Sequence, residues 1–190
     1  MTFFSGVLFL HVASALGIFA ALSLEVLVLY HLRRAASARE ARASLDLAPG
    51  VSIFFAASAS LMLLTGVYLA VQTSAWPQSW LKIAMVALFL MAPLGAVSGR
   101  RMRLIRRISG SEEPNGSELI RRLQDPALTF SLSCRMALVL GIVLLMSAKP
   151  ELRESIGVCL MSLVLGFAST PLFWRGAPAP AVRAPFGNSR

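Results

Sequence analysis

The sequence predicts an all-α, polytopic membrane protein with five transmembrane helices. The 190-residue chain is 56% hydrophobic and only 14% charged, whereas about a quarter of the residues in an ordinary soluble domain carry a charge. Its apolar residues gather in long runs, and most of its basic residues lie between those runs. The hydrophobic content excludes a disordered chain, and two cysteines exclude a disulfide scaffold.

Five apolar runs are long enough to cross a bilayer, because a span needs roughly 20 mostly apolar residues at about 1.5 Å of rise each. Backbone groups in lipid must bond within their own segment, and no run alternates as a strand would, so each is predicted to be a helix. The predicted spans cover residues 4–32, 50–72, 80–98, 128–148 and 155–174. We expect one transmembrane domain over residues 1–174, in which spans one to four form an antiparallel bundle and span five is added beside it. Residues 175–190 are predicted to be a flexible tail.

Polar and proline residues predict where the spans begin and end. Asp46 and Pro49 are predicted to start the second span as a cap and a first-turn proline. A short polar turn at residues 72–78 makes spans two and three a hairpin. Asp125-Pro126 is predicted to start the fourth span, and Lys149-Pro150 to end it.

The distribution of basic residues predicts the orientation. Residues 33–48 contain four arginines, residues 99–127 contain seven, and the tail contains three, so that 14 of the 18 Lys and Arg residues lie on one side. The positive-inside rule then places the N-terminus outside and the C-terminus in the cytoplasm of a bacterial inner membrane. The apolar run continues well past the cleavage-like Ala13-Ser14-Ala15, so the first span is predicted to be retained.

His11 is the first ionisable residue inside a span. It lies on the order of 10 Å below the outer boundary, where it could ligate copper or haem or relay a proton. Tyr68 and Lys82 are predicted at a similar depth and form a predicted outer polar cluster with His11. Met85 and Met146 are soft potential ligands nearby. The alternative is a neutral histidine that is hydrogen-bonded to a hydroxyl or carbonyl of the bundle.

Glu25 and Arg135 are predicted to form a buried ion pair. Each lies roughly 10 to 12 Å from the cytoplasmic side, on spans one and four respectively. A single unpaired charge at that depth would cost about 3 to 5 kcal/mol, so the opposite charges at equal depth indicate that the two side chains meet. A structural role is the first interpretation; a proton or ion pathway, or an Arg135 that snorkels alone, are the alternatives.

The segment after span three is basic and amphipathic, which is typical of contact with anionic lipid headgroups on the cytoplasmic side. A second interfacial helix is predicted over residues 117–123. Because the membrane explains the charge, we do not expect nucleic acid as a partner. The predicted headgroup contacts are Arg100, Arg101, Arg103, Arg106 and Arg107.

Small residues at four-residue spacing predict close approaches between helices. The pattern occurs as Gly95-x-x-x-Gly99 in span three and as Ser162-x-x-x-Gly166-x-x-x-Thr170 in span five. Such patterns support packing in general and leave a homodimer open.

Several short strings resemble a family of bacterial integral membrane proteins of unknown function, which is in turn similar to the membrane part of CopD-like copper-resistance proteins. The resemblance covers roughly residues 5–150 and implies no established chemistry. The chain departs from the family pattern at Ile18-Phe19-Ala20-Ala21, where the family has a Trp-x-Gly-Gly type stretch. The strings are Leu10-His11-Val12 with Ala15 and Gly17, Leu47-Ala48-Pro49-Gly50, Leu64-Thr65-Gly66, Trp80-Leu81-Lys82, and Leu145-Met146 before Lys149-Pro150.

The sequence contains no nucleophile elbow, phosphate-binding glycine loop, HExxH motif or paired carboxylates, so no enzyme is predicted. We expect a structural or accessory protein of a membrane process, which supports a larger membrane complex. The alternative is a small transporter or copper-handling protein centred on His11. The third hypothesis is a haem-binding electron carrier, which would need His11 from two subunits of a dimer.

Overall fold

The structure, a computed structural model, describes residues 2–34, 38–109 and 126–175, and every regular element in those ranges is an α-helix. Each helix contains an apolar stretch long enough to cross a membrane. The predicted fold class, an all-α polytopic membrane protein, is therefore confirmed. The helices are α1 (Phe3–Arg34), α2 (Ala38–Gln72), α3 (Ser79–Ser109), α5 (Pro126–Ala148) and α6 (Leu152–Arg175).

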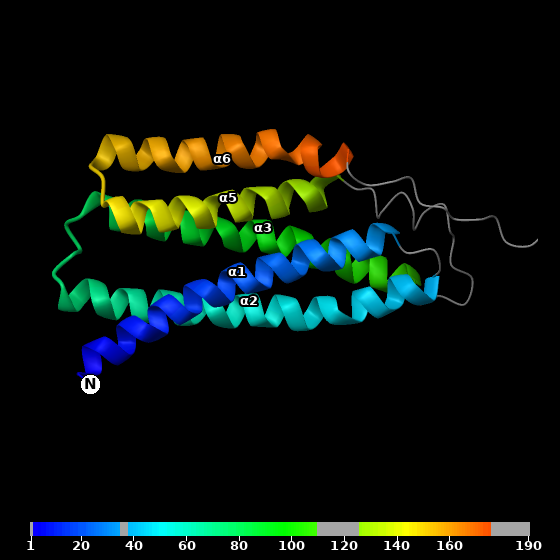
Figure 1. The fold of residues 1–190 in the computed structure, drawn as a ribbon, viewed down its shortest axis with the longest axis horizontal. Helices are drawn as coiled ribbons and strands as arrows, with labels where there is room; N and C mark the ends of the chain where they lie inside the picture. Colours follow the sequence, from blue (N-terminus) through cyan, green and yellow to red (C-terminus); the bar gives the residue numbers. More distant parts are fainter. Residues whose placement is uncertain (1, 35–37, 110–125, 176–190) are drawn as a thin grey trace, which may run out of the picture.

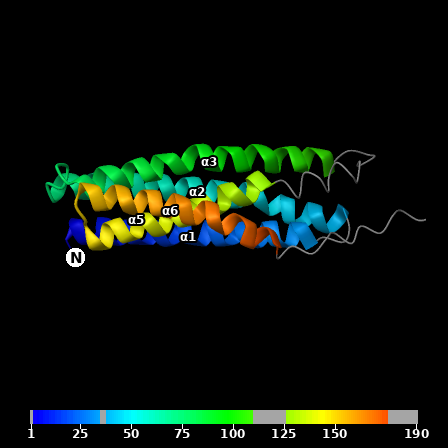
Figure 2. The same ribbon diagram turned by 90° about the horizontal axis from the view of Figure 1, so that it is seen from above.

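Successive helices run in opposite directions (Figure 1). Helices α1, α2, α3 and α5 pack in a ring, and α6 lies against α5 and, less extensively, against α3. Figure 2 shows the same long, parallel-sided bundle from above. The N-terminus, the α2–α3 turn and the α5–α6 turn share one end of the bundle, which we call the N-terminal end. We call the opposite end the basic end, because α3 carries its five arginines there.

The outer surface of the bundle is apolar. In water, so much exposed apolar surface would be unfavourable, whereas acyl chains solvate it at no such cost. The exterior therefore fits a bilayer, in agreement with the lengths of the helices. Examples from all five helices are Phe9, Ile53, Phe89, Leu140 and Phe167, each of which is more than half exposed.

Two helices extend beyond their predicted spans at the basic end. Helix α2 begins at Ala38 and α3 continues to Ser109, so the prediction that Asp46 and Pro49 start a helix is wrong: both lie inside α2. The physical reason is tertiary packing. Leu45 of α2 and Met102 and Ile105 of α3 are all buried in the hydrophobic core, and this burial offsets the loss of the backbone hydrogen bond that Pro49 cannot donate. The segments predicted as loops therefore lengthen the bundle.

Helix α2 ends in a Schellman motif, in which Ala75 N donates to Ala70 O at 2.9 Å and Ser74 N donates to Val71 O at 3.2 Å. The motif requires a left-handed residue, and Ser74 has φ 52°. Glycine adopts this conformation without the steric strain of a side chain, so Ser74→Gly is expected to raise the free energy of unfolding by about 1 kcal/mol. Thermal unfolding in detergent measures the change. Gln78→Gly, in the same turn, is the control, and an equal gain for both variants would contradict the interpretation.

Helix pairs approach most closely at small residues. An added Cβ at Gly17 of α1 would lie 2.5 Å from Ser58 Oγ of α2, and one at Gly166 of α6 would lie 2.8 Å from the Cys134 Cα of α5. The close approach predicted for the small-residue stripe of span five is therefore confirmed at Gly166. It is wrong for Gly95 and Gly99, where an added Cβ would meet only an arginine guanidinium, of Arg135 at 3.7 Å and of Arg103 at 4.0 Å, and no backbone of a neighbouring helix.

Candidate functional site

The ion pair predicted between spans one and four is present in the structure. Arg135 Nη2 of α5 donates to Glu25 Oε1 of α1. The side chains are 3% and 18% exposed, respectively. At this depth, a pair of opposite charges costs less free energy than a single unpaired charge.

Arg135 contacts each of the other three helices in the ring. Besides Glu25 on α1, its Nη2 lies 3.5 Å from Ser98 Oγ of α3. Its Cζ lies 5.5 Å from the ring centroid of Phe55 on α2, which is a cation–π geometry. One side chain thus joins α5 to α1, α2 and α3, and Arg135 is the polar centre of the bundle.

A chain of hydroxyl groups continues from this pair. Ser98 Oγ donates to Ser131 Oγ at 3.0 Å, and Ser131 Oγ donates to the Leu94 carbonyl at 2.6 Å. Arg135 Nε is buried and has no hydrogen-bond partner among the residues that the structure describes. The donors of the guanidinium are therefore not all used by Glu25 and Ser98.

A cavity of about 360 Å³ lies beside the ion pair, between α2 and α3, and we call it the ion-pair cavity. Its polar lining consists of Glu25, Arg135 and three serines, and the rest is apolar. Both helices contribute small residues to the lining. These are Ala56 and Ala59 from α2 and Ala92, Gly95 and Gly99 from α3.

His11 lies nearer the N-terminal end and is hydrogen-bonded to Thr65 of α2. His11 Nδ1 is 3.0 Å from Thr65 Oγ1, and the threonine hydroxyl in turn lies 2.7 Å from the Leu61 carbonyl. A hydroxyl has one proton, and the carbonyl can only accept it, so Nδ1–H of His11 donates to Thr65. This arrangement assigns the proton to Nδ1 and leaves the lone pair on Nε2. An added Cβ at Gly66 would lie 3.1 Å from His11 Cε1, so glycine makes room for the ring.

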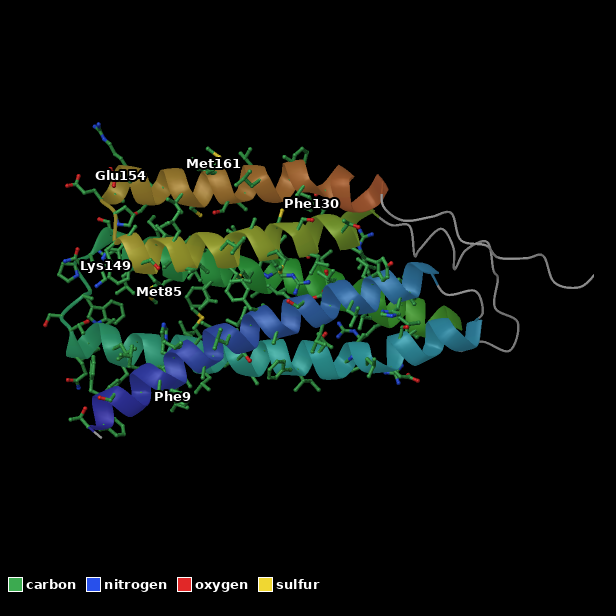
Figure 3. The ribbon with its side chains drawn as sticks, viewed as in Figure 1. Phe9, Met85, Phe130, Lys149, Glu154 and Met161 are labelled. Atoms are coloured by element: carbon green, nitrogen blue, oxygen red, sulfur yellow. The ribbon has the colours of Figure 1, made fainter. Side chains whose placement is uncertain are left out.

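His11 lines two adjoining spaces. The larger, which we call the His11 cavity, has about 530 Å³, and its lining includes Gln78 and Lys149 from the turns at the N-terminal end and Trp80 from the start of α3. The smaller has about 30 Å³. We call it the methionine gap, because three thioether side chains line it together with His11: Met62, Met85 and Met146. Figure 3 shows Met85 and Lys149 at this end of the bundle.

The structure does not assemble the predicted outer polar cluster. Tyr68 packs edge-on against Phe3, with 5.5 Å between ring centroids, and it lines neither space beside His11. Lys82 is exposed, on the same outward face of α3 as Val86 and Phe89. Tyr68 and Lys82 were predicted at the depth of His11. Their positions around their helix axes, however, direct both side chains away from His11. Lys149 is the cation that lines the His11 cavity instead.

The predicted headgroup-binding arginines lie on the helical extension of α3, and four of them, Arg100, Arg103, Arg106 and Arg107, are exposed. Arg106 Nη2 lies 3.4 Å from Asp46 Oδ1 of α2. The second interfacial helix, predicted at residues 117–123, lies outside the described residues.

The residues that complete both sites do not stand out in the sequence. Thr65 and Met62 beside His11, and Ser98 and Phe55 beside Arg135, are ordinary residues of apolar spans. The signal for Thr65 was its position directly before Gly66, which gives the histidine ring both a hydroxyl partner and space. Among the described residues, no group of three or more His, Cys, Asp and Glu could hold a metal ion.

Comparisons with protein-family models, curated proteins and solved structures gave no match for this chain. The resemblance to CopD-like proteins therefore stays a prediction from the quoted strings.

Proposed function

We propose that this integral membrane protein handles a soft metal ion, with Cu(I) as the ion that its donor set favours. The observation that supports the proposal is the methionine gap, where His11 and three methionines line one small space. This is the copper-handling alternative that the sequence suggested, centred on the same histidine.

The chemistry of the gap favours a soft metal ion over a hard one. Thioethers and imidazole suit Cu(I), whereas Ca²⁺ and Mg²⁺ need oxygen ligands. The hydrogen bond to Thr65 keeps the Nε2 lone pair of His11 free for a metal and fixes the ring, as partners of metal-binding histidines commonly do. A space of about 30 Å³ matches the size of one ion. The much larger His11 cavity beside it provides the approach from the N-terminal end.

Purified protein is expected to bind one Cu(I) per chain in competition with a chromophoric Cu(I) chelator. His11→Ala should weaken the affinity by more than about tenfold, and Thr65→Val, which removes only the partner that orients the ring, by about tenfold. Met85→Leu should also weaken binding, because a similar volume is kept and a sulfur is lost.

Met91→Leu is the matched control, because Met91 is a buried methionine of α3 that lines the ion-pair cavity instead of the methionine gap. Equal losses for Met85→Leu and Met91→Leu would contradict the proposal. A protein that retains no Cu(I) would support the accessory role instead. A haem absorbance that disappears in His11→Ala would support the dimeric electron carrier, although His11 faces cavities inside the bundle.

We place the protein in a bacterial inner membrane, with the N-terminal end outside and the basic end in the cytoplasm. The concentration of arginine in segments that meet at one end of the bundle supports this orientation. Metal ions would then approach His11 from the periplasmic side.

A further inference from the structure

The ion-pair cavity opens at the side of the bundle. Its lining includes Ser52, Ala56 and Ser60 of α2, and Ala92 and Ala96 of α3, and all five of these residues are exposed. They lie within the apolar stretches of their helices that can cross a membrane. The mouth of the cavity therefore faces the surrounding acyl chains, while Glu25 and Arg135 lie deeper inside it.

Helices α2 and α3 are linked to each other on both sides of this mouth. A short turn connects them at the N-terminal end, and Arg106 and Asp46 pair at the basic end. Between the turn and the Arg106–Asp46 pair, the small residues of the two helices line the cavity and do not fill the space between the helices. The opening is thus bounded along its length by two transmembrane helices, which are linked to each other beyond it at both ends.

Beyond the cavity, toward the basic end, the same face of α3 carries an arginine. Gly95 and Gly99 line the cavity, and Arg103 continues the same four-residue spacing toward the basic end. The Nη1 of Arg103 lies 4.0 Å from the position that a Cβ on Gly99 would take, so its guanidinium extends back toward the cavity. Arg103 is exposed, and Arg100 and Arg107 lie on neighbouring turns.

We propose that the ion-pair cavity holds an acyl chain of an anionic phospholipid, whose phosphate binds Arg103 at the basic end. From Arg103 to Gly99 the helix rises about 6 Å, so a headgroup beside the arginine places the start of its acyl chain at the cavity. The chain then lies over the Ala and Gly residues of α2 and α3. It covers the mouth, excludes water from Glu25 and Arg135, and strengthens their attraction.

The size of the cavity favours an acyl chain over a transmembrane helix. A helix with its side chains is at least about 10 Å across, so 360 Å³ would hold roughly one turn of it. An acyl chain is much thinner and conforms to the shape of the space. A second copy of the protein, docked through one of its helices, is therefore the less fitting occupant, and the retention of lipid distinguishes the two.

The test is native mass spectrometry of the full chain in detergent, titrated with phosphatidylglycerol or with phosphatidylcholine of the same chains. Wild type is expected to retain one phosphatidylglycerol in preference to phosphatidylcholine. The double variant Ala56→Phe/Ala96→Phe fills the mouth and should lose this lipid. Ala57→Phe/Val97→Phe is the control, because it adds the same rings at exposed neighbouring positions outside the cavity lining.

The charge is tested separately, since Arg103→Gln leaves the cavity intact. It should lower the preference for phosphatidylglycerol about fivefold, as expected for one basic residue near a membrane surface. Arg153→Gln, on an exposed residue at the N-terminal end of the bundle, should not change it. Equal lipid retention by the two phenylalanine double variants would overturn the proposal, as would wild type without a retained lipid. A dimer that Ala56→Phe/Ala96→Phe dissociates without loss of lipid would assign the site to a second copy.

Discussion

Arg135→Leu is expected to lower the free energy of unfolding by about 3 to 5 kcal/mol, because it leaves the Glu25 carboxylate deep in the bundle without its partner. The same change removes the contacts of the guanidinium with Ser98 and Phe55, which join α5 to α3 and α2. Thermal unfolding in detergent and the amount of protein that accumulates in the membrane both measure the effect.

The double variant Glu25→Gln/Arg135→Leu should recover part of this loss, since no unpaired charge then remains in the bundle. Arg106→Leu is the matched control. Its ion pair with Asp46 is also between helices, but the side chains are 54% and 65% exposed, so the loss should be within about 1 kcal/mol. If Arg135→Leu and Arg106→Leu were equally stable, Arg135 would not be the structural centre of the bundle.

Gly166→Val is expected to cost about 3 kcal/mol, at the upper end of the range for overpacking a well-packed core. An added Cβ would lie 2.8 Å from Cys134 Cα and 3.2 Å from Cys134 N, and backbone atoms of α5 cannot rotate away as a side chain can. Helix α6 must therefore move outward. This movement also disrupts the edge-on contact of Phe130 with Phe167, whose ring centroids are 5.9 Å apart.

Gly157→Ala provides the control on the same helix, because an added Cβ at Gly157 meets no atom within 4 Å. Alanine there should leave stability unchanged or raise it by up to about 1 kcal/mol through its better helix propensity. Proteolysis of the α5–α6 region, measured in parallel with thermal unfolding, reports whether α6 has separated from α5. Unfolding temperatures that match for Gly166→Val and wild type would show that α6 does not depend on this close approach.

The ion pair and the outer polar cluster show how far the depth of two residues in the membrane predicts that their side chains meet. Glu25 and Arg135 were matched by depth and sign alone, and the structure brings them together, because a charge in a bundle must find a partner. Tyr68 and Lys82 were matched to His11 by depth as well, yet both point elsewhere. Neither needs His11, since an exposed lysine can extend along the surface and a tyrosine can pack on a neighbouring ring.

The ends of α2 and α3 show a second limit. Residues 38–48 and 99–109 are polar enough to be predicted as loops, and Pro49 suggested a helix start. In the structure, Leu45, Met102 and Ile105 are buried in one hydrophobic core, into which both extensions pack. This burial depends on α2 and α3 being side by side, and neither segment alone contains enough apolar surface to indicate it.

The sequence is enough to predict the number of membrane-spanning helices, their alternating directions and the depth of each ionisable residue, because hydrophobic length and the need to pair backbone groups in lipid act on each segment separately. The tertiary structure alone decided which way each helix faces. It therefore decided that Arg135 contacts three other helices, that three methionines line one gap with His11, and that α2 and α3 enclose a cavity. In lipid all apolar faces of a helix are nearly equivalent, so the choice among them follows from close packing at small residues and from the few polar contacts between helices.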